Sequence, residues 1–314
     1  MVLIKDFFNL HWLKKSDKMN FPDRYAAIDV GSNGMRLLIA KVVEVNGVTS
    51  VQKLSLVRVP IRLGEDVFNE GVISEDKKEK FIKTIKAYKL LMDIYQVKDF
   101  RAVATSAMRE AKNGNEIANL IKKDTDIDIS LIDGKMEADL IFSTIYTQNI
   151  SKNDSYLFID VGGGSTEITI FNKGKRVESK SFKIGTVRLL QEKVEDKNWN
   201  ELDHWLNNVV NSDKDFKAIG TGGNINRYFK LSRNAHLEPV KLDVLEELYT
   251  NLNSLTKEER AEKFRLRYDR ADVIVPAGKI YLTILKKCGI DEIIVPKIGL
   301  SDGIVYYLFK RDNN

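Results

Sequence analysis

Two stretches of the chain repeat the same order of hydrophobic and polar positions. Tyr25-Ala-Ala-Ile-Asp-Val-Gly-Ser32 and Tyr156-Leu-Phe-Ile-Asp-Val-Gly-Gly163 match at a constant offset, 156 − 25 = 131 residues. In each, an apolar β-rich run ends in aspartate, passes through a glycine turn and returns as a second strand. The return strands and the turns after them are Leu37–Val45 with Asn46-Gly47, and Ile168–Phe171 with Asn172-Lys173-Gly174. These patterns predict the same β-hairpin in both halves of the chain.

A second repeated pattern supports an internal duplication. Arg101-Ala-Val-Ala-Thr-Ser106 and Lys217-Ala-Ile-Gly-Thr-Gly222 are short apolar strands that lead into hydroxyl or glycine turns, and a helical pattern follows each. Helical periodicity predicts helices at Asp76–Tyr95, Asn115–Lys123, Met136–Gln148, Trp199–Asn211, Leu242–Asn251, Lys257–Phe264 and Pro276–Cys288. Strands that alternate with helices are typical of α/β layers. The sequence therefore predicts two similar α/β domains that face one another across a cleft.

Composition excludes several classes of protein. The length of 314 residues allows two compact domains, and 43% hydrophobic with 30% charged residues is an ordinary globular balance. The single cysteine, Cys288, excludes a disulfide framework and a cysteine-built zinc site. The three histidines lie far apart in sequence, which argues against a histidine metal cage. No run approaches the roughly 20 apolar residues of a membrane span, so we expect a cytoplasmic protein without a membrane partner.

The charge pattern does not predict a nucleic-acid partner. Lys+Arg number 50 and Asp+Glu 45, a net charge of +5. Five lysines recur every third residue, at Lys77, Lys80, Lys83, Lys86 and Lys89. We interpret them as the solvated face of an amphipathic helix, with a polyanion-binding face as the alternative. Residues 1–20 lack the pattern of a secretory signal; we expect an N-terminal extension there, either a further amphipathic helix or residues before a natural start at Met19.

The two glycine turns have the composition of phosphate-binding loops. In Gly162-Gly-Gly-Ser-Thr-Glu167, successive backbone N–H groups can converge on an anion, and two hydroxyls can donate further hydrogen bonds. Gly31-Ser-Asn-Gly34 offers a similar cradle. Asp29 and Asp160 end their strands where a hard cation would bridge to phosphates, and carboxylates favour Mg²⁺, or Mn²⁺ as a substitute. Neither turn has the spacing of a P-loop or of a dinucleotide fingerprint, so the pattern favours a two-sided phosphate clamp.

The motifs together resemble those of one family. They appear in the order Asp29-Val-Gly-Ser-Asn33, Ala104-Thr-Ser-Ala-Met-Arg109, Met136-Glu-Ala138, Ile159-Asp-Val-Gly-Gly-Gly-Ser-Thr-Glu167, Ile219-Gly-Thr-Gly-Gly223 and Arg270-Ala-Asp-Val-Ile-Val-Pro276. From about Tyr25 to Tyr307, the chain resembles the exopolyphosphatase / guanosine pentaphosphate phosphohydrolase (Ppx/GppA) family of the actin-like superfamily. The resemblance implies an α/β fold of two ribonuclease-H-like domains, with mixed five-stranded sheets facing an interdomain cleft. The expected domains are residues 21–135 and 136–314, with the last helix, about 302–312, packed back on the first domain.

The resemblance also implies an activity. It is hydrolysis of a terminal phosphoanhydride, releasing orthophosphate from inorganic polyphosphate or, alternatively, from guanosine pentaphosphate. The family's catalytic glutamate falls on Glu137, and the carboxylates of its second phosphate loop fall on Asp160 and Glu167; which glutamate is the base stays open. Asp29 and Asp160 are the expected Mg²⁺ ligands. The expected phosphate-binding residues are Ser32, Asn33, Arg36, Arg109, Gly162, Gly163, Gly164, Ser165, Thr166 and Gly222.

The chain also departs from the family pattern. Gly299-Leu-Ser-Asp-Gly303 stands where the family commonly has Gly-Leu-Arg-Glu-Gly, so that arginine is missing. The chain ends soon after the actin-like core, as in the short form of the family. Arg62, in a basic-then-acidic loop, is expected to reach the cleft. Competing functions are an actin-like small-molecule kinase, with an adenosine pocket near Gly220-Thr-Gly-Gly223, and a non-catalytic nucleotide-binding protein. A homodimer is expected from the frequency of such assemblies.

Overall fold

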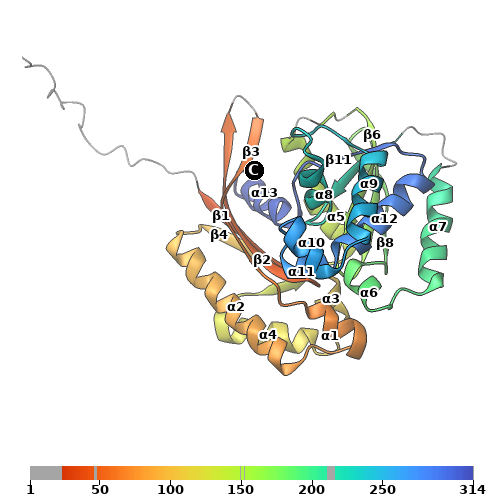
Figure 1. Cartoon of the computed structure of the whole chain (residues 1–314). Helices are drawn as coiled ribbons and strands as arrows, with labels where there is room; N and C mark the ends of the chain where they lie inside the picture. Colours follow the sequence, from red (N-terminus) through yellow and green to blue (C-terminus); the bar gives the residue numbers. More distant parts are fainter. Residues whose placement is uncertain (1–22, 46–47, 149, 152, 211–215, 314) are drawn as a thin grey trace, which may run out of the picture.

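A computed structural model of the chain describes residues 23–45, 48–148, 150–151, 153–210 and 216–313. The expected N-terminal extension and the turn at residues 46–47 lie outside these residues. The strands are β1 (Arg24–Gly31), β2 (Gly34–Val45), β3 (Val48–Val59), β4 (Asp99–Ala104), β5 (Ile129–Leu131), β6 (Ser155–Val161), β7 (Thr166–Asn172), β8 (Lys175–Phe182), β9 (Lys217–Thr221), β10 (Val240–Lys241) and β11 (Glu292–Ile294). They form two mixed sheets with helices on both sides (Figure 1).

The two sheets repeat one topology. The first has the order β3-β2-β1-β4-β5, and the second has the order β10-β11-β9-β6-β7-β8. In each, the strand that ends in aspartate pairs antiparallel with its hairpin partner and parallel with the second predicted strand, β4 or β9. The predicted duplication and the α/β fold with two mixed sheets are confirmed. The two-residue strand β10 gives the second sheet one strand more than the first.

The helices cover the outer face of each sheet, apart from two that lie between the sheets. They are α1 (Leu63–Glu70), α2 (Glu75–Ile94), α3 (Ser106–Glu110), α4 (Gly114–Thr125), α5 (Gly134–Ser143), η1 (Ile145–Thr147), α6 (Thr186–Leu190), α7 (Asp196–Val210), α8 (Ile225–Ser232), α9 (Leu242–Asn253), α10 (Lys257–Lys263), α11 (Tyr268–Ala271), α12 (Ile274–Lys287) and α13 (Leu300–Asn313). One hydrophobic core joins α1–α4 to the first sheet, and another joins α7, α9 and α12 to the second. We call β1–β5 with α1–α4 the first lobe, and β6–β11 with α6–α12 the second lobe.

A third core connects the lobes through α5 and α13, which lie between the two sheets (Figure 1). It joins Leu38 of the first sheet and Phe158 of the second to apolar residues of both helices. A Cβ on Gly303 would lie 2.2 Å from the carbonyl oxygen of Leu140, so glycine allows α13 to approach α5 this closely. Because β1 and β6 have side chains buried on both faces, their sequences are continuous apolar runs rather than alternating ones.

Each helix predicted from sequence is present in the structure, and the differences from the predictions are local. The lysine-rich helix is α2, where Lys80 and Lys83 form exposed ion pairs with acids one turn earlier, as expected of a solvated face. Lys77 differs, because it pairs with Asp66 of α1 and is only 15% exposed. The helix predicted at Met136–Gln148 ends at Ser143, and the 3₁₀ turn η1 follows it. The expected loop at Arg62 opens α1, and the Arg62 guanidinium binds Asp272 of the second lobe instead of lining the cavity described below. No helix among the described residues has the length and apolar content that crossing a membrane requires.

Candidate active site

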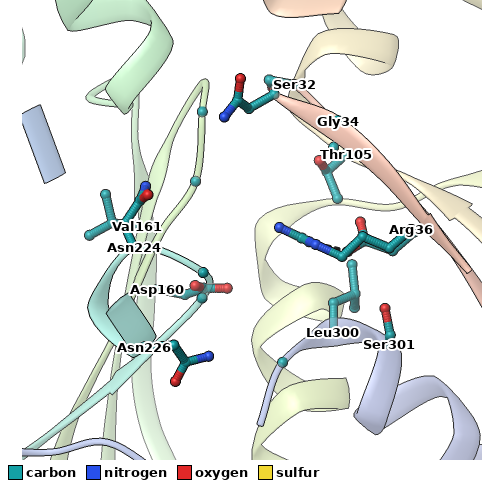
Figure 2. Close-up of a pocket in the computed structure, with 18 of the residues that line it drawn as sticks. Ser32, Gly34, Arg36, Thr105, Asp160, Val161, Asn224, Asn226, Leu300 and Ser301 are labelled. Carbon is teal, nitrogen blue, oxygen red and sulfur yellow. Dashed lines mark hydrogen bonds and ion pairs between the residues drawn. The ribbon is translucent and has the colours of Figure 1, made fainter. Parts of the chain in front are cut away.

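A cavity of about 320 Å³ lies between the lobes, where the two hairpin turns face each other (Figure 2). Most of the residues singled out from sequence line it: Asp29, Ser32, Asn33, Arg36, Glu137, Asp160, Gly162, Gly163, Ser165, Glu167 and Gly222. They come from β1, β2, α5, β6, β7 and the turn after β9. Three other residues, Arg109, Gly164 and Thr166, lie outside the lining. The duplicated fold thus brings together residues that are more than 100 positions apart in sequence.

The first hairpin carries an ion pair. Asp29 on β1 lies directly across from Arg36 on β2, and Nη1 of Arg36 donates to Oδ2 of Asp29 at 2.5 Å. The Asp29 carboxylate raises the pKa of Arg36 above its ordinary value, although burial opposes the shift. In Figure 2, the Arg36 side chain extends across the cavity towards Asp160. The first hairpin therefore neutralises its own aspartate while it presents a guanidinium to the cavity.

The second hairpin carries two carboxylates at the equivalent positions. Asp160 on β6 lies directly across from Glu167 on β7. Burial, and after it the charge of Glu167, raises the pKa of Asp160 to about 7. Burial also raises the pKa of Glu167, whose Oε1 accepts hydrogen bonds from Ser165 at 2.7 Å and Ser181 at 2.8 Å. These hydroxyls hold the Glu167 carboxylate in one orientation.

Glu137 adds a third acid from the first turn of α5. Asp133 caps the N-terminus of that helix, because its Oδ1 accepts a hydrogen bond from the backbone N–H of Met136 at 2.8 Å. A Cβ on Gly134 would lie 2.9 Å from Cγ of Glu167, so the helix starts directly against β7. Burial and then the charges of Glu167, Asp160 and Asp29 raise the pKa of Glu137 well above its usual range. A carboxyl with this environment is suited to accept a proton near neutral pH.

The three predicted residues outside the lining have other contacts. Nη1 of the exposed Arg109 donates to the carbonyl of Ile132 at 2.5 Å, and its charge opposes the rise in the pKa of both glutamates. The buried Thr166 hydroxyl donates to the carbonyl of Ile184 at 2.6 Å, so it supports the turn. Gly164 packs against the first lobe, where a Cβ would lie 2.4 Å from Oγ of Ser106. Close approach between lobes, not only anion binding, therefore requires glycine in this turn.

Sequence reasoning missed the cations that share the cavity. Lys53, Arg58, Arg270 and Lys297 also line it. Arg58 forms an ion pair with Asp269 of the second lobe. Burial, followed by the charges of Arg36 and Arg58, lowers the pKa of Arg270 to about 9. The motif Arg270-Ala-Asp was a signal for Arg270, whereas Arg58 stands near the end of β3, outside any motif.

The donor set fits a divalent cation bound together with a phosphorylated ligand. Among the described residues, no three Asp, Glu, His or Cys side chains converge closely enough to hold a metal ion. Asp29 already binds Arg36, so Asp160 and its neighbour Glu167 are the freer ligands. Mg²⁺ usually takes one or two carboxylates and completes its shell with waters and substrate phosphates. A cation here would also offset the burial and the repulsion from Glu167 that raise the pKa of Asp160.

Comparisons with known proteins agree with this geometry. The sequence model of the Ppx/GppA phosphatase family matches residues 38–312. The bifunctional 3-dehydroquinate synthase/phosphatase of Fusobacterium nucleatum is 28% identical over 312 aligned positions; the match covers 90% of this chain but 47% of that protein. The chain thus spans about half the length of this curated relative.

Solved structures share the whole arrangement. The structure of the Ppx/GppA family member from Aquifex aeolicus is 26% identical with a TM-score of 0.75, covering 93% of this chain and 99% of that one. An exopolyphosphatase from Cytophaga hutchinsonii is 25% identical with a TM-score of 0.79, covering 92% and 98% respectively. The two-lobed fold is therefore that of these proteins over nearly their full length.

Proposed function

The chain belongs to the Ppx/GppA phosphatase family, and we propose that it hydrolyses the terminal phosphoanhydride of inorganic polyphosphate, releasing orthophosphate. One observation carries the proposal: Glu137 and the like-charged pair Asp160–Glu167 face the guanidiniums of Arg36 and Arg270 in one cavity. The names of the relatives support it, since one is a synthase/phosphatase and another an exopolyphosphatase.

The cations of the cavity suit a phosphate tail. Phosphoryl transfer needs in-line positioning, neutralisation of spread negative charge and an oriented nucleophile. Arg36 and Arg270 each present planar donors that match phosphate oxygens. The lowered pKa of Arg270 reflects burial beside other cations, an arrangement that a bound polyanion would stabilise. The backbone N–H groups of the turns at Ser32 and Gly162 add neutral donors.

Between the two glutamates, we assign the base to Glu137. Glu167 has one oxygen occupied by two hydroxyl donors, whereas no hydrogen bond among the described residues engages the Glu137 carboxylate. A water proton moves to Glu137 while the water oxygen attacks the terminal phosphorus. The bond between that phosphorus and the bridging oxygen breaks, giving orthophosphate and a chain one phosphate shorter. Glu167 orients the neighbouring Ser165 and Ser181 side chains through the hydrogen bonds that it accepts from them.

We assign the metal ligand to Asp160, with Asp29 or Glu167 as its second carboxylate. When bound, Mg²⁺, or Mn²⁺ in its place, would supply charge neutralisation on the terminal phosphates. We assign the positioning of the phosphates to Arg36 and Arg270, and the proton transfer to Glu137.

The test is orthophosphate release in the presence of Mg²⁺ from long-chain polyphosphate, guanosine pentaphosphate and ATP. We expect release from polyphosphate, and a loss of about 10²–10⁴-fold in the Glu137→Gln protein. The matched control is Asp139→Asn, since Asp139 lies on the same helix and only pairs with Arg176 at the surface; it should retain activity within about twofold.

Other outcomes would replace the proposal. Release from guanosine pentaphosphate in preference to polyphosphate would assign the alternative substrate to the same site. Consumption of ATP only with an added small acceptor would indicate a kinase. Binding without turnover of any substrate would indicate a non-catalytic nucleotide- or polyphosphate-binding protein.

A further inference from the structure

A second pocket, of about 490 Å³, opens beside the candidate active site. It is lined by Asn226, Phe229, Lys230, Arg233, Asn234 and Lys297. Two of these residues, Asn226 and Lys297, also line the cavity between the lobes. The pocket therefore borders the cavity where the terminal phosphate would be hydrolysed.

The local sequence explains why these residues gather on one face. Phe229 and Lys230 lie three and four residues after Asn226, and Arg233 lies three residues after Lys230, so the four share one side of α8 and its end. Arg233 ends the helix with φ 63°, in the left-handed region. Lys297, in the segment before α13, also has a positive φ of 58° and reaches this face from the other side.

All charged residues that line the pocket are positive. Its lining contains three cations, Lys230, Arg233 and Lys297, and no acidic residue. Within the described part of the chain, none of the three forms an ion pair with a carboxylate. Two cations of the first cavity differ, since Arg58 binds Asp269 and Lys53 binds Asp302 at 2.8 Å. The buried Oδ1 of Asn226, at the junction, has no hydrogen-bond partner in the described structure.

This chemistry fits phosphates better than a nucleobase. Phe229 is only 2% exposed, and Nζ of Lys297 lies 4.6 Å from its ring centroid, so the ring offers no open face for stacking. The lining has no carboxylate to accept the N–H donors of a guanine edge. Unpaired ammonium and guanidinium groups, by contrast, are the natural partners of phosphate oxygens.

We propose that this pocket binds the distal phosphates of a linear polyphosphate whose terminal phosphate occupies the cavity between the lobes. The inference rests on the proposed function and adds to it a reason to prefer long chains over short ones. A tripolyphosphate would engage chiefly the first cavity, whereas a long chain would also contact Lys230, Arg233 and Lys297.

The experiment compares KM for long-chain polyphosphate with KM for tripolyphosphate. In the double variant Lys230→Glu/Arg233→Glu, the ratio of the two KM values, long chain to tripolyphosphate, should rise about tenfold, since two lost contacts of about 0.7 kcal/mol each add to about 1.4 kcal/mol. Lys230→Arg/Arg233→Lys keeps both charges and should keep the ratio within about twofold. Lys122→Glu/Lys123→Glu, which reverses two exposed charges on α4 in the first lobe, matches the change in net charge and should do the same.

The outcomes separate this inference from the function it rests on. Wild-type protein that releases phosphate from polyphosphate, with a ratio unchanged in the reversed variant, would overturn the pocket and leave the function standing. Direct titration of the Glu137→Gln protein with long-chain polyphosphate and with guanosine pentaphosphate tests the pocket without turnover. Weaker binding of polyphosphate in the reversed variant supports it, even if no substrate is hydrolysed. A loss confined to guanosine pentaphosphate would overturn it.

Discussion

The two hairpins of this protein share a backbone plan but differ in charge at one cross-strand position. In the first lobe, Asp29 faces Arg36; in the second, Asp160 faces Glu167. These positions are equivalent, because 29 and 160, like 36 and 167, differ by 131. Opposite charges directly across a strand pair stabilise a sheet, whereas like charges destabilise it. The two hairpins therefore share one architecture, and their different roles follow from one position, which is Arg36 in the first hairpin and Glu167 in the second.

The difference separates a self-neutralised hairpin from one that needs a counter-charge. Arg36 balances Asp29 within the folded chain, so the first hairpin is complete without a ligand. Burial raises the pKa of both Asp160 and Glu167, and the charge of Glu167 adds to the rise at Asp160. The second hairpin gives up stability to hold reactive carboxylates, as active sites commonly do. The following predictions test that contrast, from the largest effect to the smallest.

Breaking the first pair should cost the most stability. In the Arg36→Leu protein, the Asp29 carboxylate would stay buried without a cation, and the free energy of unfolding should fall by about 3–5 kcal/mol. Urea denaturation measures it. Arg36→Lys keeps a charge at this position and should recover much of the loss. A change below about 1 kcal/mol for Arg36→Leu would show that the ion pair does not stabilise the hairpin.

The second hairpin should make stability depend on pH. The folded-state pKa of Asp160, about 7, lies above the unfolded value near 4, so the folded protein binds more protons between these limits. The contribution of this group is fully present below about pH 4 and is lost as pH rises through 7, on the order of 4 kcal/mol in all. Thermal melts without divalent cations, from pH 4.5 to 8, measure the slope. Addition of Mg²⁺ at pH 8 should reverse part of the loss; a Tm that rises from pH 5 to 8 in the absence of cations would contradict the assignment.

The two aspartates should respond oppositely to the same substitution. Asp160→Asn removes a repelled charge, so Tm at pH 8 should rise while kcat/KM falls roughly 100-fold, or about 2.7 kcal/mol. Asp29→Asn removes the partner of Arg36, so its Tm should fall. Calorimetry and phosphate-release assays on both proteins provide the comparison. Equal signs of the two Tm changes would mean that the hairpins do not differ in the way proposed.

Two glycines of the second turn, Gly162 and Gly164, should differ in the stability that replacement by alanine costs. A Cβ at Gly164 would lie 2.4 Å from Oγ of Ser106 and 2.5 Å from the ring of Phe68, both in the first lobe. Gly164→Ala should therefore cost about 2 kcal/mol of stability. At Gly162, the closest atom to a Cβ would be the carbonyl oxygen of Ser165, at 3.1 Å. Gly162→Ala, measured by the same urea series, should cost less than half as much.

Much of the fold was predictable because its signals are local. The offset repeat, the aspartates that end β1 and β6 and the glycine turns predicted paired hairpins and the residues that line the cavity. Boundaries that depend on neighbours were not predictable: the helix expected to reach Gln148 stops at Ser143. Likewise Arg62, expected in the cleft, binds Asp272 because α11 and α12 of the second lobe pass beside it.

The sequence by itself determined the duplicated hairpins and the aspartates near the ends of β1 and β6, since each depends on residues within a few positions of one another. Glu137 was assigned from the resemblance to the family. Only the tertiary structure decided which cations join these acids. Arg58, Arg270 and Lys297 come from separate elements, and the packing of the lobes places them on one cavity. It also decided the charge state of that cavity, because the pKa of Asp160 depends on burial and on Glu167 across the strand. Charge interactions act through space, so no linear spacing could have specified them.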